Sequence, residues 1–347
     1  MNRNSIYGEI YAFDNLLTAY KKCRKGHRYQ TTALRYHENF EENLVNLQNH
    51  LIWNSWEPGK AKFFTVTDPK MREITAPPFK DRVLHHALHQ VIEPYFERRF
   101  IFDSYACRKG KGVYQAADRL QYFLRKAKRE LGNGFYIVKC DIKKYFASIQ
   151  HSILLTQFTK TIPDQQVCHL FELAIKGYGF DDGIGMPVGA LTSQLSGNIM
   201  LDPLDHKIKD DWGCKYYLRY MDDFVVLVKD KAAAKLMLAN IEREVNALGL
   251  TLNPKSGYFP WQRGVDFCGY RAWPTHRLPR KRTVKRAKTR IAKSIKKYQK
   301  EQATFKGVRA HIFSFMAYMN RCDAKTTLQC ILDESAVTKN AIKHFPL

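Results

Sequence analysis

The sequence predicts an α+β fold in which helices cover an antiparallel sheet. Three observations support this prediction. Apolar runs bounded by turn residues predict strands at 135–142, 216–228, 250–259 and 264–272. Segments with apolar residues at helical spacing lie before and between these strands, and a strongly basic segment with the same spacing follows them.

Three segments are predicted helices. Residues 81–93 place their apolar side chains on one face, and Pro94 is expected to end that helix. Residues 152–171 are predicted as one continuous helix. Residues 231–248 form another, with Gly249 as the residue just past its end.

The charge of the chain indicates a polyanionic partner. Its 347 residues carry 57 Lys and Arg against 33 Asp and Glu, for a net charge of +24 and a pI near 9.7. Nucleic acid is the first candidate and an anionic membrane surface is the competing one. No apolar run approaches the roughly 20 residues of a spanning helix. The first ten residues lack the apolar core of a secretion signal, so we expect a cytoplasmic protein.

Cysteine and histidine give little sign of a metal site. The eight cysteines include no Cys-x-x-Cys pair, so neither zinc nor a disulfide framework is indicated, and reduced thiols in the core are expected. His85 and His89 would share a helix face, as metal ligands sometimes do. Because the pattern lacks the glutamate of a zincin motif, no metal role is expected for them.

The basic segment is a separate unit. From Arg277 to Arg309 there are fourteen Lys or Arg and one acid, Glu301. One apolar stripe should dock on a core: Val284, Ala287, Ile291, Ile295 and Tyr298. The other faces are positively charged and suit a duplex backbone. A merely solvated helix, the alternative, would normally mix acids with the bases.

Three carboxylates carry the strongest chemical signal. Residues 220–223 read Tyr-Met-Asp-Asp between two apolar runs, which places Asp222 and Asp223 at the tip of a predicted hairpin. Turn chemistry alone can explain adjacent aspartates. A third acid, Asp141, ends the strand-like run before it. Three carboxylates at strand ends could hold two Mg²⁺ ions for phosphoryl transfer.

With these motifs the chain resembles a reverse transcriptase, from about Lys70 to Tyr270 in the motif order of that family. The resemblance implies a right-hand polymerase fold with fingers, an antiparallel-sheet palm and a basic helical thumb. The corresponding domains are the N-terminal region and fingers at 1–134, the palm at 135–275 and the helical thumb at 276–347.

The resemblance also assigns the palm residues. Asp141, Asp222 and Asp223 match the catalytic, metal-binding trio, and the Ile142 carbonyl would complete a site for two Mg²⁺ ions. Phe146, the fifth residue after the first aspartate, matches the steric gate. A bulky ring there excludes a 2′-hydroxyl, so the substrates should be the four dNTPs.

Further residues are assigned to nucleotide and template. Lys70 and Arg72, in a turn between strands, match the fingers cations that contact the triphosphate, although alone they suit solvated surface charges. Template and primer contacts are implied for Arg82, Arg108, Lys255, Gly269, Arg282 and Arg286. For Lys255 and Gly269, core or turn roles are the alternative.

Residues 185–194 depart from the common pattern of the family. Most members carry Gln-Gly-x-x-x-Ser-Pro, whereas this chain has Val188 in place of the Gln and Gln194 in place of the Pro. That pairing resembles the enzymes of diversity-generating retroelements. Val188, Gly189 and Gln194 would then line the dNTP site, and an apolar Val removes a polar restraint on base-pair geometry. Lower fidelity is expected, and the resemblance implies errors at template adenines.

The sequence therefore predicts an RNA-directed DNA polymerase of a diversity-generating retroelement, which makes mutagenised cDNA. Its implied partners are template RNA, the RNA–DNA duplex and a small basic pentameric accessory protein, with no membrane. A retron-like or defence-associated reverse transcriptase with the same chemistry is the nearest alternative. A catalytically silent RNA-binding protein on the same fold is the alternative from another class.

Overall fold

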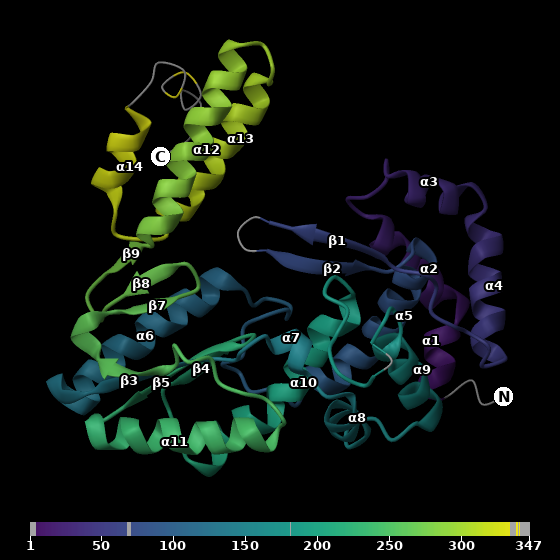
Figure 1. Cartoon of the computed structure of the whole chain (residues 1–347), viewed down its shortest axis with the longest axis horizontal. Helices are drawn as coiled ribbons and strands as arrows, with labels where there is room; N and C mark the ends of the chain where they lie inside the picture. Colours follow the sequence, from purple (N-terminus) through teal and green to yellow (C-terminus); the bar gives the residue numbers. More distant parts are fainter. Residues whose placement is uncertain (1–4, 68–70, 181, 334–337, 339, 341–347) are drawn as a thin grey trace. The chain divides into compact units, whose positions relative to one another are not determined.

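The computed structural model describes residues 5–67, 71–180, 182–333, 338 and 340 (Figure 1). The chain divides into two compact units, each assembled from segments that are far apart in the sequence. Unit 1 comprises residues 1–109, 140–215 and 239–256, and unit 2 comprises residues 110–139, 216–238 and 257–347. The fingers, palm and thumb boundaries stay a prediction.

Unit 1 is mainly helical. Its helices are α1 (Ile6–Tyr11), α2 (Phe13–Arg24), α3 (Thr31–Glu38), α4 (Phe40–Ile52), α5 (Phe79–Glu97), α7 (Tyr145–Ser148), α8 (His151–Thr159), α9 (Gln165–Lys176) and α10 (Leu191–His206), which continues as a π-helical turn, Lys207–Asp211. Helix α5 packs against both α2 and α10. Its apolar face is fully buried at Val83, Leu84, Ala87, Leu88 and Ile92, as the sequence predicts.

Unit 1 also contains a two-stranded hairpin. Strands β1 (Lys62–Val66) and β2 (Arg72–Ala76) pair antiparallel, with Phe64 opposite Ile74. All five residues of β1 are exposed. The turn expected between two strands is thus placed between β1 and β2, and residues 68–70, including Lys70, lie outside the described residues.

Two helix predictions for unit 1 were wrong. Helix α5 does not end at Pro94 but continues to Glu97. Pro94 lacks a backbone N–H and so costs one helical hydrogen bond, but burial of later residues such as Phe96 outweighs that loss. The predicted helix 152–171 is two helices, α8 and α9. Pro163 cannot continue α8, and the carboxylate of Asp164 caps α9 by accepting from the amides of Gln166 and Val167 at 3.0 and 3.2 Å.

Unit 2 contributes most of the four-stranded sheet. Strands β4 (Tyr217–Tyr220), β5 (Asp223–Val228), β3 (Tyr136–Asp141) and β6 (Gly257–Pro260) form one sheet in the order β4-β5-β3-β6. The pairs β4–β5 and β3–β6 are antiparallel. Helix α6 (Val113–Leu131), which the sequence analysis did not foresee, packs against β4 and β5. The predicted strands are therefore present, although the one at 250–259 forms only at its end.

Two elements contain residues of both units. Strand β3 changes unit after Lys139, and helix α11 (Lys231–Ala247) changes unit after Leu238. Helix α11 is followed by Gly249 with φ +69°, as the sequence predicts for the residue past its end.

The rest of unit 2 is a small sheet followed by three helices. Strands β7 (Val265–Phe267), β8 (Tyr270–Ala272) and β9 (Arg277–Pro279) form an antiparallel sheet. Helices α12 (Lys281–Gln299), α13 (Phe305–Met319) and α14 (Lys325–Leu332) share an apolar cluster. Ile291 is buried in that cluster and Val284, Ala287 and Ile295 pack against it, which confirms four members of the predicted docking stripe. The fifth, Tyr298, lies near the end of α12 and is exposed, so its placement in the stripe was wrong. Helices α12 and α13 lie side by side (Figure 1).

The α+β class with antiparallel sheets is confirmed. Within the described ranges, none of the helices combines the length and apolar composition needed to cross a membrane. All eight cysteines are free thiols, as predicted, but only Cys23 and Cys140 are buried.

Candidate active site

The Tyr-Met-Asp-Asp motif forms a tight hairpin in unit 2. Tyr220 pairs with Asp223, so Met221 and Asp222 are the two turn residues. Met221 has φ +55°, an uncommon value for a side chain of its size. The fully buried Arg219 donates from its guanidinium to the Met221 carbonyl at 3.0 Å. A buried arginine therefore fixes the turn that presents Asp222.

Asp223 is paired with a lysine that the sequence analysis missed. The ammonium of Lys139 lies 3.0 and 3.1 Å from the two carboxylate oxygens of Asp223. It also donates to the Asp266 carbonyl and lies 5.8 Å from the centre of the Phe267 ring. A charged residue within the otherwise apolar strand β3, two positions before Asp141, was the available signal.

Asp141 is held within unit 1 by two residues of one turn. The Asn253 amide donates to its carboxylate at 2.9 Å, and the Asn253 backbone N–H donates to its carbonyl at 2.7 Å. The Ser256 hydroxyl accepts from the Asp141 amide at 3.1 Å. Ile142, next in the chain, is 2% exposed and forms a β-bridge with Leu252. This clamp orients the carboxylate of Asp141, and sequence reasoning had singled out only Lys255 in that turn.

Phe146 follows Asp141 by five residues and lies in the short helix α7. Lys144 adopts a left-handed conformation, with φ +48°, and starts the short helix α7. The hydroxyl of Tyr145 donates to the Gly197 carbonyl at 2.5 Å, which ties α7 to α10. The Phe146 ring is half-buried, with its centroid 5.3 Å from that of Tyr145. Its role as steric gate stays a prediction.

Residues 186–190, called here the Val188 loop, contact the β1–β2 hairpin. The backbone N–H of Thr75 in β2 donates to the Val188 carbonyl at 3.1 Å. Gly189 has φ +127°, and a Cβ there would lie 3.1 Å from the Thr75 carbonyl oxygen. A larger residue at this position would therefore push the loop away from β2. Gln194 is exposed on the first turns of α10.

Arg72 and Arg82 occupy different surroundings in unit 1. Arg72 begins β2, where it is exposed and pairs directly with Val66 of β1. Arg82 is half-buried on α5, and its guanidinium lies 5.1 Å from the centre of the Phe79 ring. The predicted contacts of these arginines, and of Lys70, stay predictions.

Arg108 makes an internal cluster of bonds. Its guanidinium pairs with Glu97 at 2.8 Å and donates to the carbonyls of Ile101 at 2.6 Å and Ser104 at 3.0 Å. Its side chain is only 6% exposed. In this conformation Arg108 has a structural role, and its predicted contact with nucleic acid stays a prediction.

Lys255 and Gly269 both occupy turns. Lys255 is exposed, and its amide donates to the side chain of Asn253 at 3.1 Å. Cys268 and Gly269, with φ +47° and +90°, form the two-residue turn between β7 and β8. The Gly269 carbonyl accepts from the Tyr318 hydroxyl at 2.6 Å, which joins this turn to α13.

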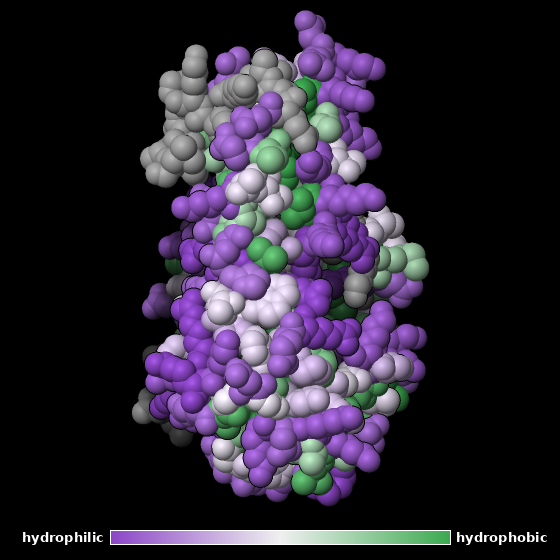
Figure 2. Space-filling view, turned by 90° about the vertical axis from the view of Figure 1, so that its left-hand side faces the viewer, coloured by the Kyte–Doolittle hydropathy of each residue, from purple (hydrophilic) through white to green (hydrophobic). Residues whose placement is uncertain are grey.

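The cationic face of α12 is extensive. The helix contains nine Lys or Arg and no acid, and all nine are exposed, Arg282 and Arg286 among them. By helical spacing, Arg282, Arg286 and Lys293 lie opposite the buried Ile291. Figure 2 shows one face of the molecule, on which hydrophilic residues predominate.

The donor set of the three aspartates and Ile142 suits a hard cation. Carboxylates and a backbone carbonyl are the ligands that Mg²⁺ prefers. Among the described residues, no group of three or more His, Cys, Asp or Glu is gathered as a metal site. A cation does already lie on Asp223, since the ammonium of Lys139 contacts both of its oxygens. The carboxylate thus accepts a positive charge, and the two-ion site stays a proposal.

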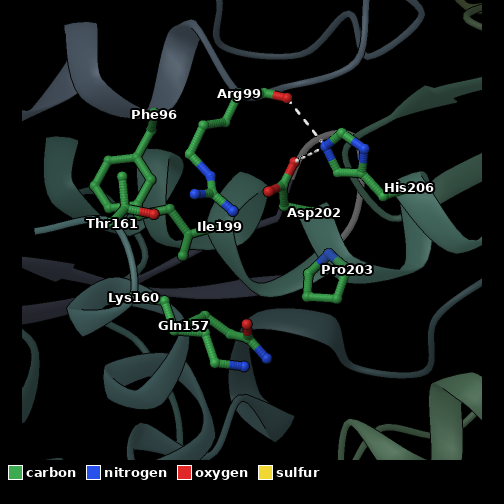
Figure 3. Close-up of a pocket in the computed structure, with 9 residues that line it drawn as sticks. All are labelled: Phe96, Arg99, Gln157, Lys160, Thr161, Ile199, Asp202, Pro203 and His206. Carbon is green, nitrogen blue, oxygen red and sulfur yellow. Dashed lines mark hydrogen bonds and ion pairs between the residues drawn. The ribbon is translucent and has the colours of Figure 1, made fainter. Parts of the chain in front are cut away.

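A separate cavity of about 270 Å³ lies in unit 1 (Figure 3). Its lining comes from α8, α10 and the end of α5, and it includes none of the predicted site residues. The Arg99 guanidinium and the Asp202 carboxylate point toward one another, and the His206 ring donates to the Arg99 carbonyl at 3.0 Å. Side chains of both charges line the cavity, Arg99 and Lys160 with Asp202.

Comparison with solved structures identifies the class of fold. Apo telomerase from Candida tropicalis matches with a TM-score of 0.53 at 12% identity, over 82% of this chain and 58% of that chain. A second structure of that telomerase, truncated from its C-terminal domain, matches with a TM-score of 0.51 at 13% identity, over 64% of this chain and 54% of that chain. The protein has the right-hand polymerase fold.

The sequence comparisons identify the family. The family model Reverse transcriptase (RNA-dependent DNA polymerase) matches residues 60–272, more than half of the chain. The chain belongs to this family of nucleotidyltransferase enzymes, as the sequence analysis predicts.

Individual relatives are more distant. The chain is 26% identical over 282 residues to Protein YkfC of Escherichia coli (strain K12), covering 69% of this chain and 72% of YkfC. It is 28% identical over 142 residues to the Group II intron-encoded protein LtrA of Lactococcus lactis subsp. cremoris, covering 39% of this chain and 22% of LtrA. It thus matches a minor part of that intron-encoded relative.

Proposed function

We propose that the protein is an error-prone RNA-directed DNA polymerase of a diversity-generating retroelement. Val188 is the main observation in favour of the retroelement type, because most of the family has a glutamine at this position. The Val188 carbonyl bonds Thr75 of β2, whose first residue is Arg72, a proposed triphosphate ligand. The proposed nucleotide contacts of the fingers and of the Val188 loop therefore belong to segments in direct contact.

The carboxylates supply the chemistry in this proposal. Asp141, Asp222, Asp223 and the Ile142 carbonyl would hold two Mg²⁺ ions, whose positive charge would favour deprotonation of the primer 3′-hydroxyl and departure of pyrophosphate. Strand β3 supports this grouping: it ends at Asp141, it neighbours β5, and it carries Lys139, which contacts Asp223 two positions before that end.

Other residues orient the substrates. Arg72 and Lys70 would neutralise the triphosphate, and Phe146 would exclude ribonucleotides. Gly189 and Gln194 would complete the nucleotide pocket beside Val188. Template RNA and the RNA–DNA duplex would contact a larger cationic set: Arg82, Arg108, Lys255, Arg282 and Arg286, with the Gly269 turn near the primer. The accessory pentamer and the cytoplasmic location remain part of the proposal.

A second candidate is a group II intron-type reverse transcriptase. The identity to LtrA favours it. The two candidates differ in fidelity, because the retroelement enzyme is expected to misincorporate opposite template adenine.

The test is to copy a defined RNA template from a DNA primer with Mg²⁺ and four dNTPs, and to sequence the cDNA. The retroelement proposal expects errors concentrated at template adenines. A low error rate that is equal for all four template bases would favour the intron-type candidate. Absence of any extension would contradict polymerisation by this chain.

A further inference from the structure

A chain of largely buried hydrogen bonds within unit 1 leads to Thr192, just after the Val188 loop. The Thr192 hydroxyl lies 2.9 Å from His85 Nδ1, and His85 Nε2 lies 3.0 Å from the Tyr178 hydroxyl. That hydroxyl donates to Asp81 Oδ2 at 3.1 Å, which also accepts from the Gly59 amide at 2.8 Å. We call Gly59, Asp81, Tyr178, His85 and Thr192 the His85 network. Four separate segments of the chain meet in it.

The direction of this network is set at one end. Asp81 Oδ2 accepts, so the Tyr178 hydroxyl must donate to it and can only accept from His85 Nε2–H. Nδ1 then lacks a proton and accepts from the Thr192 hydroxyl. Burial raises the pKa of Tyr178, and the nearby Asp81 raises it further, so the hydroxyl remains a donor. Each side-chain bond therefore depends on the next.

The backbone conformation at Tyr178 places its hydroxyl within the network. Tyr178 has φ +67°, a strained conformation for a bulky residue, yet it is 7% exposed. A Cβ on the preceding Gly177 would lie 2.6 Å from the ring of Pro58, so the turn packs tightly against the segment before β1. Strain of this kind persists only where surrounding contacts hold it.

The two ends of the network reach the two parts of the proposed nucleotide pocket. Gly59 lies three residues before β1, at the start of the β1–β2 hairpin. Thr192 lies in the first turn of α10, directly after the Val188 loop. The same loop bonds the hairpin again through Thr75. The network, the hairpin and the loop therefore form a closed circuit of contacts.

We propose that Tyr178 and His85 are positioning residues for nucleotide binding, which act through Thr192 to hold the Val188 loop against β2. The proposal rests on the placement of that loop beside the incoming nucleotide. Neither residue touches substrate in this proposal. Loss of one hydroxyl in the network should loosen the loop and weaken dNTP binding, while the chemical step stays nearly unchanged.

The test compares Tyr178→Phe and Thr192→Val with a matched control. Each variant removes one hydroxyl and keeps the shape of the side chain. Tyr7→Phe serves as control, because the Tyr7 hydroxyl is also buried and donates to the Leu51 carbonyl at 2.6 Å, outside the network. Hydrogen exchange of peptides covering residues 72–76 and 186–196 reports the loop without requiring activity. Thermal unfolding reports general loss of stability.

We expect faster exchange of both peptides in Tyr178→Phe and Thr192→Val but not in Tyr7→Phe. In single-nucleotide extension, KM for the cognate dNTP should rise about fivefold, the effect of one hydrogen bond, with kcat within about twofold. The KM of the double variant should exceed that of the more affected single variant by no more than about twofold. Both changes interrupt the same series of hydrogen bonds, so their effects should not add.

Other outcomes would overturn the proposal. Unchanged exchange in Tyr178→Phe would show that the network does not hold the loop. Faster exchange with an unchanged KM would show that Tyr178 and His85 do not affect nucleotide binding. This conclusion would hold independently of the error spectrum, which tests the proposed function instead. An equal rise in KM for Tyr7→Phe would reduce the effect to lost stability.

Discussion

The ammonium of Lys139 contacts both carboxylate oxygens of Asp223, at 3.0 and 3.1 Å. A protein cation thus occupies the carboxylate proposed to bind a metal ion. Ion binding would have to displace this ammonium or share the carboxylate with it, so Lys139 should oppose metal binding.

Replacing this lysine should strengthen metal binding. In Lys139→Met, the Mg²⁺ concentration for half-maximal primer extension should fall about two- to fivefold, the range for a partly exposed ion pair. Stabilisation against heat by Mg²⁺ alone should appear at correspondingly lower concentrations. Lys128→Met is the control, because it removes the same charge from a lysine that lies on the Trp261 ring. Equal Mg²⁺ requirements in both variants would contradict competition at Asp223.

The aspartates should be essential for extension but not for folding. Asp141→Asn and Asp222→Asn should each lower the rate of primer extension by more than about 100-fold, because each removes a metal ligand while retaining side-chain size. Circular dichroism and template affinity should stay near wild type. Asp14→Asn, at an exposed position on α2, is the control. Near-normal extension by either active-site variant would remove that residue from the metal site.

The outer face of α12 should account for part of the salt dependence of nucleic-acid binding. The triple variant Arg282→Gln, Arg286→Gln and Lys293→Gln should reduce the slope of log affinity against log salt by about three units, one for each cation. A triple change of the exposed Lys21, Lys25 and Arg28 to Gln removes the same charge elsewhere. If the two triple variants show the same slope, the α12 face does not bind phosphates.

Restoring the common glutamine should improve fidelity. In Val188→Gln, the error rate opposite template adenine should fall about fivefold, because one added hydrogen bond near the base pair is worth about 1 kcal/mol. Val188→Met lengthens the side chain without an amide and separates size from hydrogen bonding. The measurement is cDNA sequencing, scored for each template base. An unchanged adenine error rate in Val188→Gln would show that Val188 does not set fidelity.

Acid should destabilise unit 1 through His85. Burial, together with a smaller effect of the neighbouring His86, lowers the pKa of His85 to about 3. An unfolded histidine has a pKa near 6.5, so the unfolded chain binds the extra proton between these two values. The stabilisation is therefore complete above about pH 6.5 and is lost as the pH falls toward 3. Burial also lowers the pKa of His86 to about 4, with the same sign.

Urea unfolding between pH 7 and pH 5 measures this effect. In His85→Gln, the fall in unfolding free energy should be shallower than in wild type by up to about 1.4 kcal/mol per pH unit, which corresponds to one proton. The groups in contact with His85, Tyr178 and Thr192, remain present in this variant. His27→Gln replaces an exposed histidine and should retain the wild-type slope. Identical slopes in all three proteins would exclude His85 as the titrating group.

Local patterns predicted the hairpin of Asp222 and the apolar stripe of α12, because both depend on residues close in sequence. The same reasoning failed at Pro94, where tertiary burial of later residues prolongs the helix. It also missed the break at Pro163, although a proline followed by the capping Asp164 was visible. At this position the helix-ending proline and the capping aspartate were stronger signals than the helical spacing of apolar residues.

The remaining parts of the site depend on distant residues. The bonds from His85 to Tyr178 and Thr192 span 93 and 107 positions, and Asn253 reaches Asp141 across 112. No local spacing could pair them. The bonds that hold the Arg108 guanidinium, to Glu97 and two carbonyls, were also absent from the sequence reasoning, which considered only its motif.

The composition of α12 makes its folding depend on its surroundings. Like charges at helical spacing, such as Arg282 with Arg286 and Lys293 with Lys297, repel one another and no acid in the helix offsets them. Added salt should screen that repulsion and raise the melting temperature of the free protein, while the same salt releases bound nucleic acid. The helix thus responds to ionic strength in opposite directions when free and when bound.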